Sequence, residues 1–190
     1  MTKTTLDKSE LAVRLLDRAI RMFFDGDDTL FVMTMAHPAH LLLQNMAERK
    51  FPNGNGSKQV WDRLNADGVK VLEDGTQIET YNQFLNYLHR VPNAAKHANK
   101  LEETHVTYDE GNAAAIMAAA CLHAQQLECG TPFHLTYMVW RMAVGGTFGE
   151  SPDDATKEYV DINFPGIREM SKAAQLEAGR NAISALMARR

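Results

Sequence analysis

One segment constrains the fold more than any other: the run TLFVMTMAHPAHLLLQNMAERK at residues 29–50. Its apolar residues would cover nearly all sides of a helix as far as Gln44, which predicts a central, mostly buried helix over about residues 28–49. The acidic residues just before it suit the positive end of that helix's dipole. Pro38, in the middle, removes one backbone donor and predicts a kink.

Apolar residues recur with the period of an α-helix along most of the remaining chain. Residues that favour helix N-termini precede these stretches, namely Asp7, Thr80, Asp109, Thr131 and Ser151. The helix that begins at Thr80 is expected to end at Val91 and Pro92, and the alanine-rich helix after Asp109 is expected to end at Gly130. Residues 52–58 have the composition of a loop.

The period changes on both sides of Asp74 and Gly75, where apolar and polar residues alternate. An Asp-Gly pair between alternating runs is typical of a β-hairpin. No internal repeat or linker divides the chain. The sequence therefore predicts an all-α protein, a multi-helix bundle of six or seven helices with a small β-hairpin near residues 69–79, as a single domain over residues 1–190.

The composition is that of a soluble globular protein, because 45% of the 190 residues are apolar and 23% are charged. The longest apolar run, Ala113–Leu122, is about half of the roughly 20 residues that a membrane span requires, so no membrane partner is expected. Two cysteines are too few for a disulfide framework, and a cytoplasmic location is the expectation. The net charge of −4 does not favour nucleic acid as a partner.

Residues 25–29, with the sequence DGDDT, resemble the D-x-D-x-T motif of haloacid-dehalogenase-type phosphatases, in which the first Asp attacks phosphate. That chemistry requires the Asp to follow a buried parallel strand. The preceding residues instead have a helical pattern with charges at Arg14, Arg18 and Arg21. We therefore interpret residues 25–28 as a turn between two helices.

His37 and His40 have the i, i+3 spacing that could hold a metal ion on one face of a helix. Further ligands would have to come from His97, His123, His134 or a carboxylate. The alternative is a pair of buried neutral histidines that hydrogen-bond within the core. No motif such as H-E-x-x-H accompanies the pair, so no metal ligand is assigned and the cofactor is unknown.

Cationic and amide side chains gather in residues 90–100, just after a predicted helix end. Arg90, Lys96 and the backbone N–H groups of such a junction could bind an anion. Arg90 and His97 also match the R-x(4–6)-H pattern of HEPN-type helical ribonucleases, whose Arg and His act on the RNA 2′-hydroxyl and the scissile phosphate. The pattern is short enough to arise by chance, and the competing interpretation is a cation-rich helix end followed by a solvated turn.

Two segments resemble a widespread family of uncharacterised bacterial all-helical proteins. Residues 19–40 resemble its patterns A-I-x-L-F-F-x-x-x-D and V-H-T-L-A-x-A-A, and residues 93–98 resemble its pattern N-F-x-K-H-A. Met33 stands where that family has His, which would break a metal site at this position. The resemblance implies no activity. The polar residues that it retains are Asp28, Thr34, His40, Asn93, Lys96 and His97.

The leading hypothesis is a pocket for a small polar or anionic ligand around His40, Asn93, Lys96 and His97. In it, Arg90 and Lys96 would supply positive charge, Asn93 would orient the ligand, and His97 would transfer a proton or donate a hydrogen bond. One alternative is a HEPN-like, metal-independent ribonuclease with Arg90 and His97 as catalytic residues. Another is a non-enzymatic interaction protein that forms a homodimer.

Overall fold

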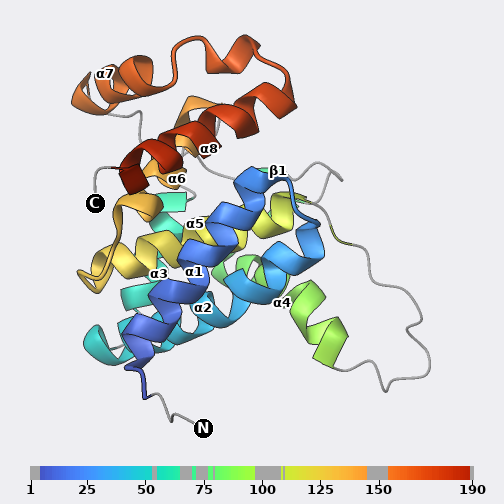
Figure 1. Ribbon diagram of the computed structural model, residues 1–190. Helices are drawn as coiled ribbons and strands as arrows, with labels where there is room; N and C mark the ends of the chain where they lie inside the picture. The colour runs from blue at the N-terminus through green and yellow to red at the C-terminus, as the bar shows by residue number, and fades with distance from the viewer. Residues whose placement is uncertain are drawn as a thin grey trace, which may run out of the picture.

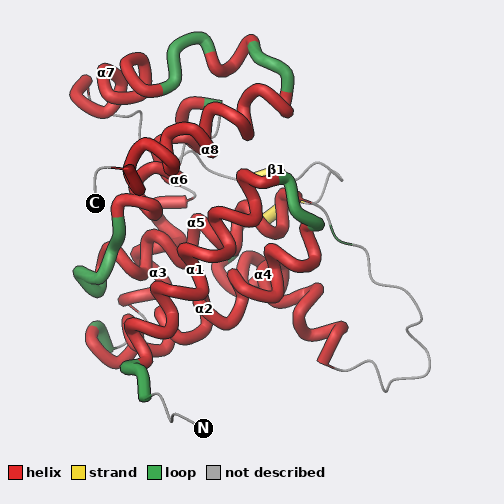
Figure 2. The backbone as a smooth tube through the Cα atoms, in the orientation of Figure 1, coloured by secondary structure: helices red, strands yellow, loops and turns green. Residues whose placement is uncertain are grey.

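The protein is all-α, as predicted (Figures 1 and 2). The computed structural model describes residues 5–52, 55–64, 70–71, 77–78, 80–96, 108, 110–144 and 154–188. Within these ranges the helices are α1 (Lys8–Asp25), α2 (Thr29–Lys50), α3 (Asn55–Leu64), α4 (Tyr81–Lys96), α5 (Glu110–Gln126), α6 (Pro132–Ala143), α7 (Asp154–Asn163), the short 3-10 helix η1 (Ile167–Glu169) and α8 (Lys172–Ala188). None of these helices is both long enough and apolar enough to cross a membrane.

The hairpin predicted near residues 69–79 is present but very short. Strands β1 (Lys70–Val71) and β2 (Gln77–Ile78) pair in antiparallel register, with Lys70 opposite Ile78. Two residues per strand make only a minimal ladder, which is marginal by itself in water. The helices therefore determine the architecture.

The apolar segment at residues 29–50 forms the central helix α2, as predicted, and it continues unbroken through Pro38. Helices α1 and α5 pack along it on two sides, and Figure 1 shows α1 and α2 lying side by side. Ala36, Ala39, Leu43 and Ala47 of α2 are completely buried. The three alanines let the neighbouring helices approach closely, and His37 and His40 of the same helix are buried in the core as well.

Residues 25–28 form the predicted turn between α1 and α2. Gly26 adopts the left-handed conformation (φ 76°) and its N–H donates to the carbonyl of Phe23, which closes α1. The Asp28 carboxylate caps α2 by accepting a hydrogen bond of 2.8 Å from the N–H of Leu30. These acidic residues follow a helix, so the strand that phosphatase chemistry requires is not there.

The aromatic residues of α1 and α6 form one side of the core. Phe23, Phe24, Tyr137 and Trp140 meet with ring centroids 5.1–6.3 Å apart, most of them edge to face. The Tyr137 hydroxyl donates to the carbonyl oxygen of Ala114 at 3.0 Å, which satisfies the buried phenol. The aromatic-rich helix after Thr131 is therefore a core element.

Two predicted helix ends are wrong. Helix α4 runs through Pro92 to Lys96, because one interior proline removes a single hydrogen bond and bends a helix more readily than it ends it. Helix α5 ends at Gln126, and Glu128, two residues before Gly130, adopts the left-handed conformation (φ 60°) that follows the helix end. Arg90 and Lys96 thus lie within a helix. The prediction that backbone N–H groups after a helix end bind an anion at this point is therefore wrong, because these residues belong to the helix itself.

The described structure has eight α-helices where six or seven were predicted, because the C-terminal part of the chain contains two. Pro165 and Gly166, the latter in the left-handed conformation (φ 64°), separate α7 from the segment that leads into α8. In addition, α3 begins at Asn55, inside the segment predicted as a loop.

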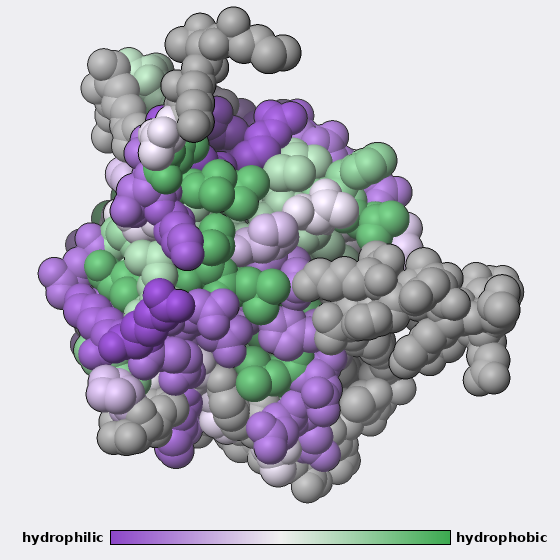
Figure 3. All heavy atoms as spheres, turned by 90° about the horizontal axis from the view of Figure 1, so that it is seen from below, coloured by the Kyte–Doolittle hydropathy of each residue, from purple (hydrophilic) through white to green (hydrophobic). Residues whose placement is uncertain are grey.

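Exposed hydrophobic side chains are scattered over several helices. In the view of Figure 3, hydrophobic patches alternate with polar ones. The most exposed large hydrophobic residues are Phe31 on α2, Leu135 on α6 and Ile162 on α7. Because single exposed hydrophobic residues are normal on protein surfaces, they identify no dimer interface, and the homodimer remains a prediction.

Gly179 allows α8 to lie directly on α1. A methyl group built at Gly179 would overlap the Phe24 ring, with the ring's Cζ only 2.7 Å away. Gly→Ala normally stabilises a helix interior by about 1 kcal/mol. Here we expect Gly179→Ala to lower the free energy of unfolding by about 1–3 kcal/mol, because the buried Phe24 ring would have to shift from its contacts with Phe23, Tyr137 and Trp140.

Urea unfolding at neutral pH measures this effect. Asn181→Ala, two residues along on the exposed side of α8, is the control and should leave the stability unchanged or slightly raised. A Gly179→Ala protein as stable as the wild type would show that α8 does not approach α1 so closely.

Candidate functional site

Four histidines meet where α4 packs against α2 and α5. We call them the histidine cluster: His37 and His40 from α2, His89 from α4 and His123 from α5. His37, His40 and His123 are only 4%, 1% and 1% exposed. Histidine is rarely so concentrated in a core, because each imidazole brings two nitrogen atoms that need hydrogen-bond partners.

His37 and His89 bond to each other across the helix junction. The Nε2 atom of His37 lies 2.9 Å from the Nδ1 atom of His89, and the two rings meet edge to face with centroids 5.1 Å apart. One of these nitrogens donates and the other accepts, so the pair requires at least one neutral ring. The contact fixes the position of α4 against α2.

His123 is held by a chain of amide hydrogen bonds. Its Nδ1 atom lies 3.2 Å from Oε1 of Gln126, whose Nε2 donates to the carbonyl of Gly56 and to Oε1 of Gln59, each at 3.1 Å. These two acceptors fix the orientation of the Gln126 amide, so Nδ1 of His123 is the donor and Nε2 carries the lone pair. Burial lowers the pKa of His123 from 6.5 to about 4, although the Gln126 bond and Glu48 favour the charged form.

His40 lies between the other rings, with its centroid 5.7 Å from that of His89 and 5.5 Å from that of His123. Its Nδ1 atom is buried and has no hydrogen-bond partner among the described residues. Burial, reinforced by repulsion from the three neighbouring histidines, holds the pKa of His40 well below its ordinary value of 6.5. His40 is therefore a neutral imidazole with an unsatisfied nitrogen.

The cluster has no arrangement suited to a metal ion. In the part of the chain that the structure describes, no three His, Cys, Asp or Glu side chains are placed so that they could hold one. His123 does join the pair His37 and His40, as a metal site would require, but its Nδ1 atom faces Gln126. The geometry is that of neutral hydrogen-bonding groups.

The residues predicted to form a pocket fall along α4. Arg90, Asn93 and Lys96 belong to this helix, but their side chains lie outside what the structure describes, and so does the whole of His97. Helical spacing places positions 93 and 96 on the same face of α4 as His89 (i, i+4 and i+7), whereas position 90 is turned away by about 100°. Of the predicted residues, Asn93 and Lys96 thus share a helix face with a histidine that contacts His40.

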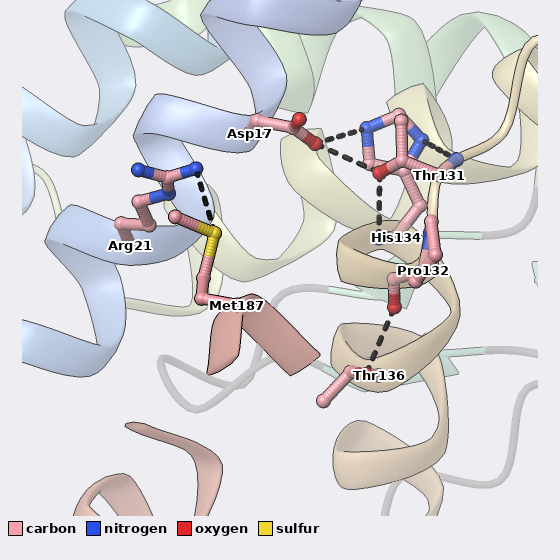
Figure 4. A network of polar contacts seen from close by, with 7 residues as sticks. All are labelled: Asp17, Arg21, Thr131, Pro132, His134, Thr136 and Met187. Carbon is pink, nitrogen blue, oxygen red and sulfur yellow. Dashed lines mark hydrogen bonds and ion pairs between the residues drawn. The ribbon is translucent and has the colours of Figure 1, made fainter. Parts of the chain in front are cut away.

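His134 has a structural role, separate from the histidine cluster (Figure 4). The ring Nδ1 of His134 accepts a hydrogen bond from the backbone N–H of Thr131 at 3.2 Å, and the backbone N–H of His134 donates to the Thr131 hydroxyl. Together they form a capping box at the start of α6. Asp17 of α1 joins this box, with Oδ1 2.8 Å from Oγ1 of Thr131 and 3.1 Å from Nε2 of His134. The network ties α6 to α1 and leaves His134 no role in a metal site.

Cys121 is a core residue, as predicted. It is 3% exposed, and burial together with the charge of Asp17 raises the pKa of its thiol well above the ordinary value. Since the thiolate is the reactive form, this cysteine is not a nucleophile.

The histidine cluster should make the fold sensitive to acid. The folded-state pKa of His123 lies below the unfolded value, so the unfolded chain binds its proton first as the pH falls. The contribution of neutral His123 to the free energy of unfolding is therefore fully present above about pH 6.5. It decreases as the pH falls to about 4, by about 3 kcal/mol in total. The urea midpoint measured across this range should fall, and His123→Gln should show a smaller fall. Equal pH dependence in both proteins would contradict the assignment.

Comparisons with known proteins assign no family to this chain. No protein-family model, no curated protein and no solved structure matches it. The resemblance to a bacterial helical family therefore remains a prediction from residues 19–40 and 93–98, and function has to be inferred from the geometry.

Proposed function

We propose that the protein binds a small polar ligand where α4 packs against α2 and α5, with His40 as the buried group that hydrogen-bonds to it. The unsatisfied Nδ1 atom of His40 is the observation that supports this most directly. A buried polar atom without a partner costs about 1–3 kcal/mol, and native proteins generally keep such atoms where water or a ligand completes the bond.

The chemistry of the cluster limits what the ligand can be. A neutral imidazole can donate or accept a hydrogen bond, but it brings no charge, and the lowered pKa values of His40 and His123 keep both rings neutral near pH 7. An anionic group therefore needs a cation from elsewhere. On α4, Lys96 can supply that cation and Asn93 a polar anchor, because both positions follow His89 along one helix face.

The ligand expected from these residues has two parts. A hydrogen-bonding group would reach the neutral cluster beside His40, and an anionic group would lie toward the C-terminal end of α4, near Lys96. Arg90 lies on a different face of α4, so it does not belong to this row. Pairing with both His40 and Lys96 would satisfy the buried nitrogen and a lysine charge at once, which gives selectivity for a compact polar anion.

Inorganic phosphate is a suitable probe, because its oxygens accept from Lys and its hydroxyl can hydrogen-bond to a neutral imidazole. We expect saturable binding that shifts the ring signals of His40 in a proton–nitrogen NMR spectrum. Lys96→Gln should weaken binding by about tenfold. Lys58→Gln, which removes an exposed lysine that pairs with Asp62 on α3, is the matched control and should not change it.

Two results would overturn this proposal. One is phosphate binding that leaves the His40 ring signals in place, and the other is equal affinity in the Lys96→Gln and Lys58→Gln proteins. We expect both variants to keep the fold, because each substitution exchanges one polar side chain for another. Thermal unfolding of each variant without phosphate confirms this.

A further inference from the structure

We propose a second binding site, for a small organic anion with an apolar body, in a hollow between α1 and α8. This site is independent of the histidine cluster and does not rest on the function proposed for it. The hollow has a volume of about 290 Å³. Ligand pockets are usually about 300–1,000 Å³, so this one suits a compact molecule. It is lined by Arg21, Phe24, Asp25, Arg180, Ile183, Ser184 and Met187.

The hollow arises from the way the two helices cross. Because Gly179 lets α8 rest on the Phe24 ring, the next residues of α8 face α1 across a short gap. Positions 180, 183, 184 and 187 have the i, i+3, i+4 and i+7 spacing of one helix face. Positions 21, 24 and 25 form the matching row on α1.

Arg21 contributes a cation that has no carboxylate partner among the described residues. Its Nε atom is buried without a hydrogen bond, and its Nη2 atom only reaches the sulfur of Met187 at 3.8 Å (Figure 4). The guanidinium carbon lies 4.7 Å from the centroid of the Phe133 ring. Sulfur is a weak acceptor and an aromatic face offers no lone pair, so the donors of Arg21 are incompletely satisfied.

Both carboxylates one turn away from Arg21 are already engaged. Asp17 contacts Thr131 and His134, and Asp25 forms an ion pair with Arg180 at 3.3 Å. Asp25 also lines the hollow, where its charge opposes that of an incoming anion. The lining nevertheless carries a net positive charge, because it contains two arginines, Arg21 and Arg180, and a single carboxylate, Asp25.

Arg180 is held in place beside this cation. Its Nε and Nη2 atoms donate to the carbonyl oxygen of Phe24 at 3.3 and 3.0 Å, which fixes the guanidinium at the C-terminal end of α1. A guanidinium has five N–H donors, so Arg180 retains donors beyond these contacts. Two arginines over one hollow favour a carboxylate or phosphate, which accepts planar, paired hydrogen bonds.

The remaining walls determine the rest of the ligand. Phe24, Ile183 and Met187 present apolar atoms, which favour a hydrophobic body attached to the anionic group. The exposed residue Ser184 lies at the edge of the hollow and adds one hydroxyl. A single carboxylate on a ring or a short branched chain fits both the charge and the apolar walls.

Benzoate tests this site, with neutral benzamide as the control of the same shape. Titration followed by the Met187 methyl signal in NMR should show saturable binding of benzoate, and at least about tenfold weaker binding of benzamide. Arg21→Gln should lower the affinity for benzoate by about tenfold or more. Arg18→Gln removes an exposed arginine of the same helix that does not line the hollow. This control should change the affinity for benzoate by less than about twofold.

Ser184→Phe provides a second test that leaves both arginines intact. Because Ser184 is exposed, a phenyl ring there should fill the hollow and abolish benzoate binding without lowering the melting temperature. Equal binding of benzoate and benzamide, equal effects of Arg21→Gln and Arg18→Gln, or unchanged binding by Ser184→Phe would each overturn the proposal. Lys96→Gln should leave benzoate binding intact, which separates this site from the histidine cluster.

Discussion

The burial of α2 is the constraint on which the rest of the structure depends. Apolar residues lie on most sides of α2, and α1 and α5 pack against it and bury Ala36, Ala39 and Leu43, while Leu30 and Phe31 near its start remain exposed. His37 and His40 lie within this apolar surface and are buried with it. A charged imidazole would be costly in that position, and burial favours the neutral form of His40 and His123. His89 and His123 are the partners that other helices supply.

Polar atoms left over after packing indicate where ligands can bind. Several polar side chains in the described part of the chain are satisfied within the fold, as in the capping box of Thr131 and His134 or the amide bonds of Gln126. Nδ1 of His40 and Nε of Arg21 are not satisfied among the described residues. Nδ1 of His40 lies among other imidazole rings, whereas Nε of Arg21 lies near Arg180. The two sites therefore suit different ligands.

The sequence predicts the helices well because their signals are local. Thr131 and Pro132 start α6, Thr80 precedes α4 and forms a capping box with Gln83, and the length and apolarity of α2 are evident from its residues. The end of α4 could not be predicted, because whether Pro92 ends a helix or only bends it depends on packing around it.

The contacts that form both candidate sites are long-range and carry no local pattern. His89 is 52 positions from His37, and Arg21 is 166 positions from Met187. The only sequence signal for His89 as a site residue is its helical spacing to Asn93 and Lys96. The packing of α8 on α1 depends on Gly179, and the sequence gives no sign that Phe24 lies against this glycine.

The protonation state of His40 tests most directly whether α2 buries its histidines as neutral groups. Proton–nitrogen NMR of the imidazole rings distinguishes neutral from charged histidine, and contacts between ring protons identify which histidines are neighbours. Burial predicts that His40 is still neutral at pH 6.5, where a histidine in a short peptide is about half charged. It also predicts that its ring contacts those of His89 and His123. A His40 ring that becomes charged near pH 6.5, or that has no contact with His123, would contradict this account of the core.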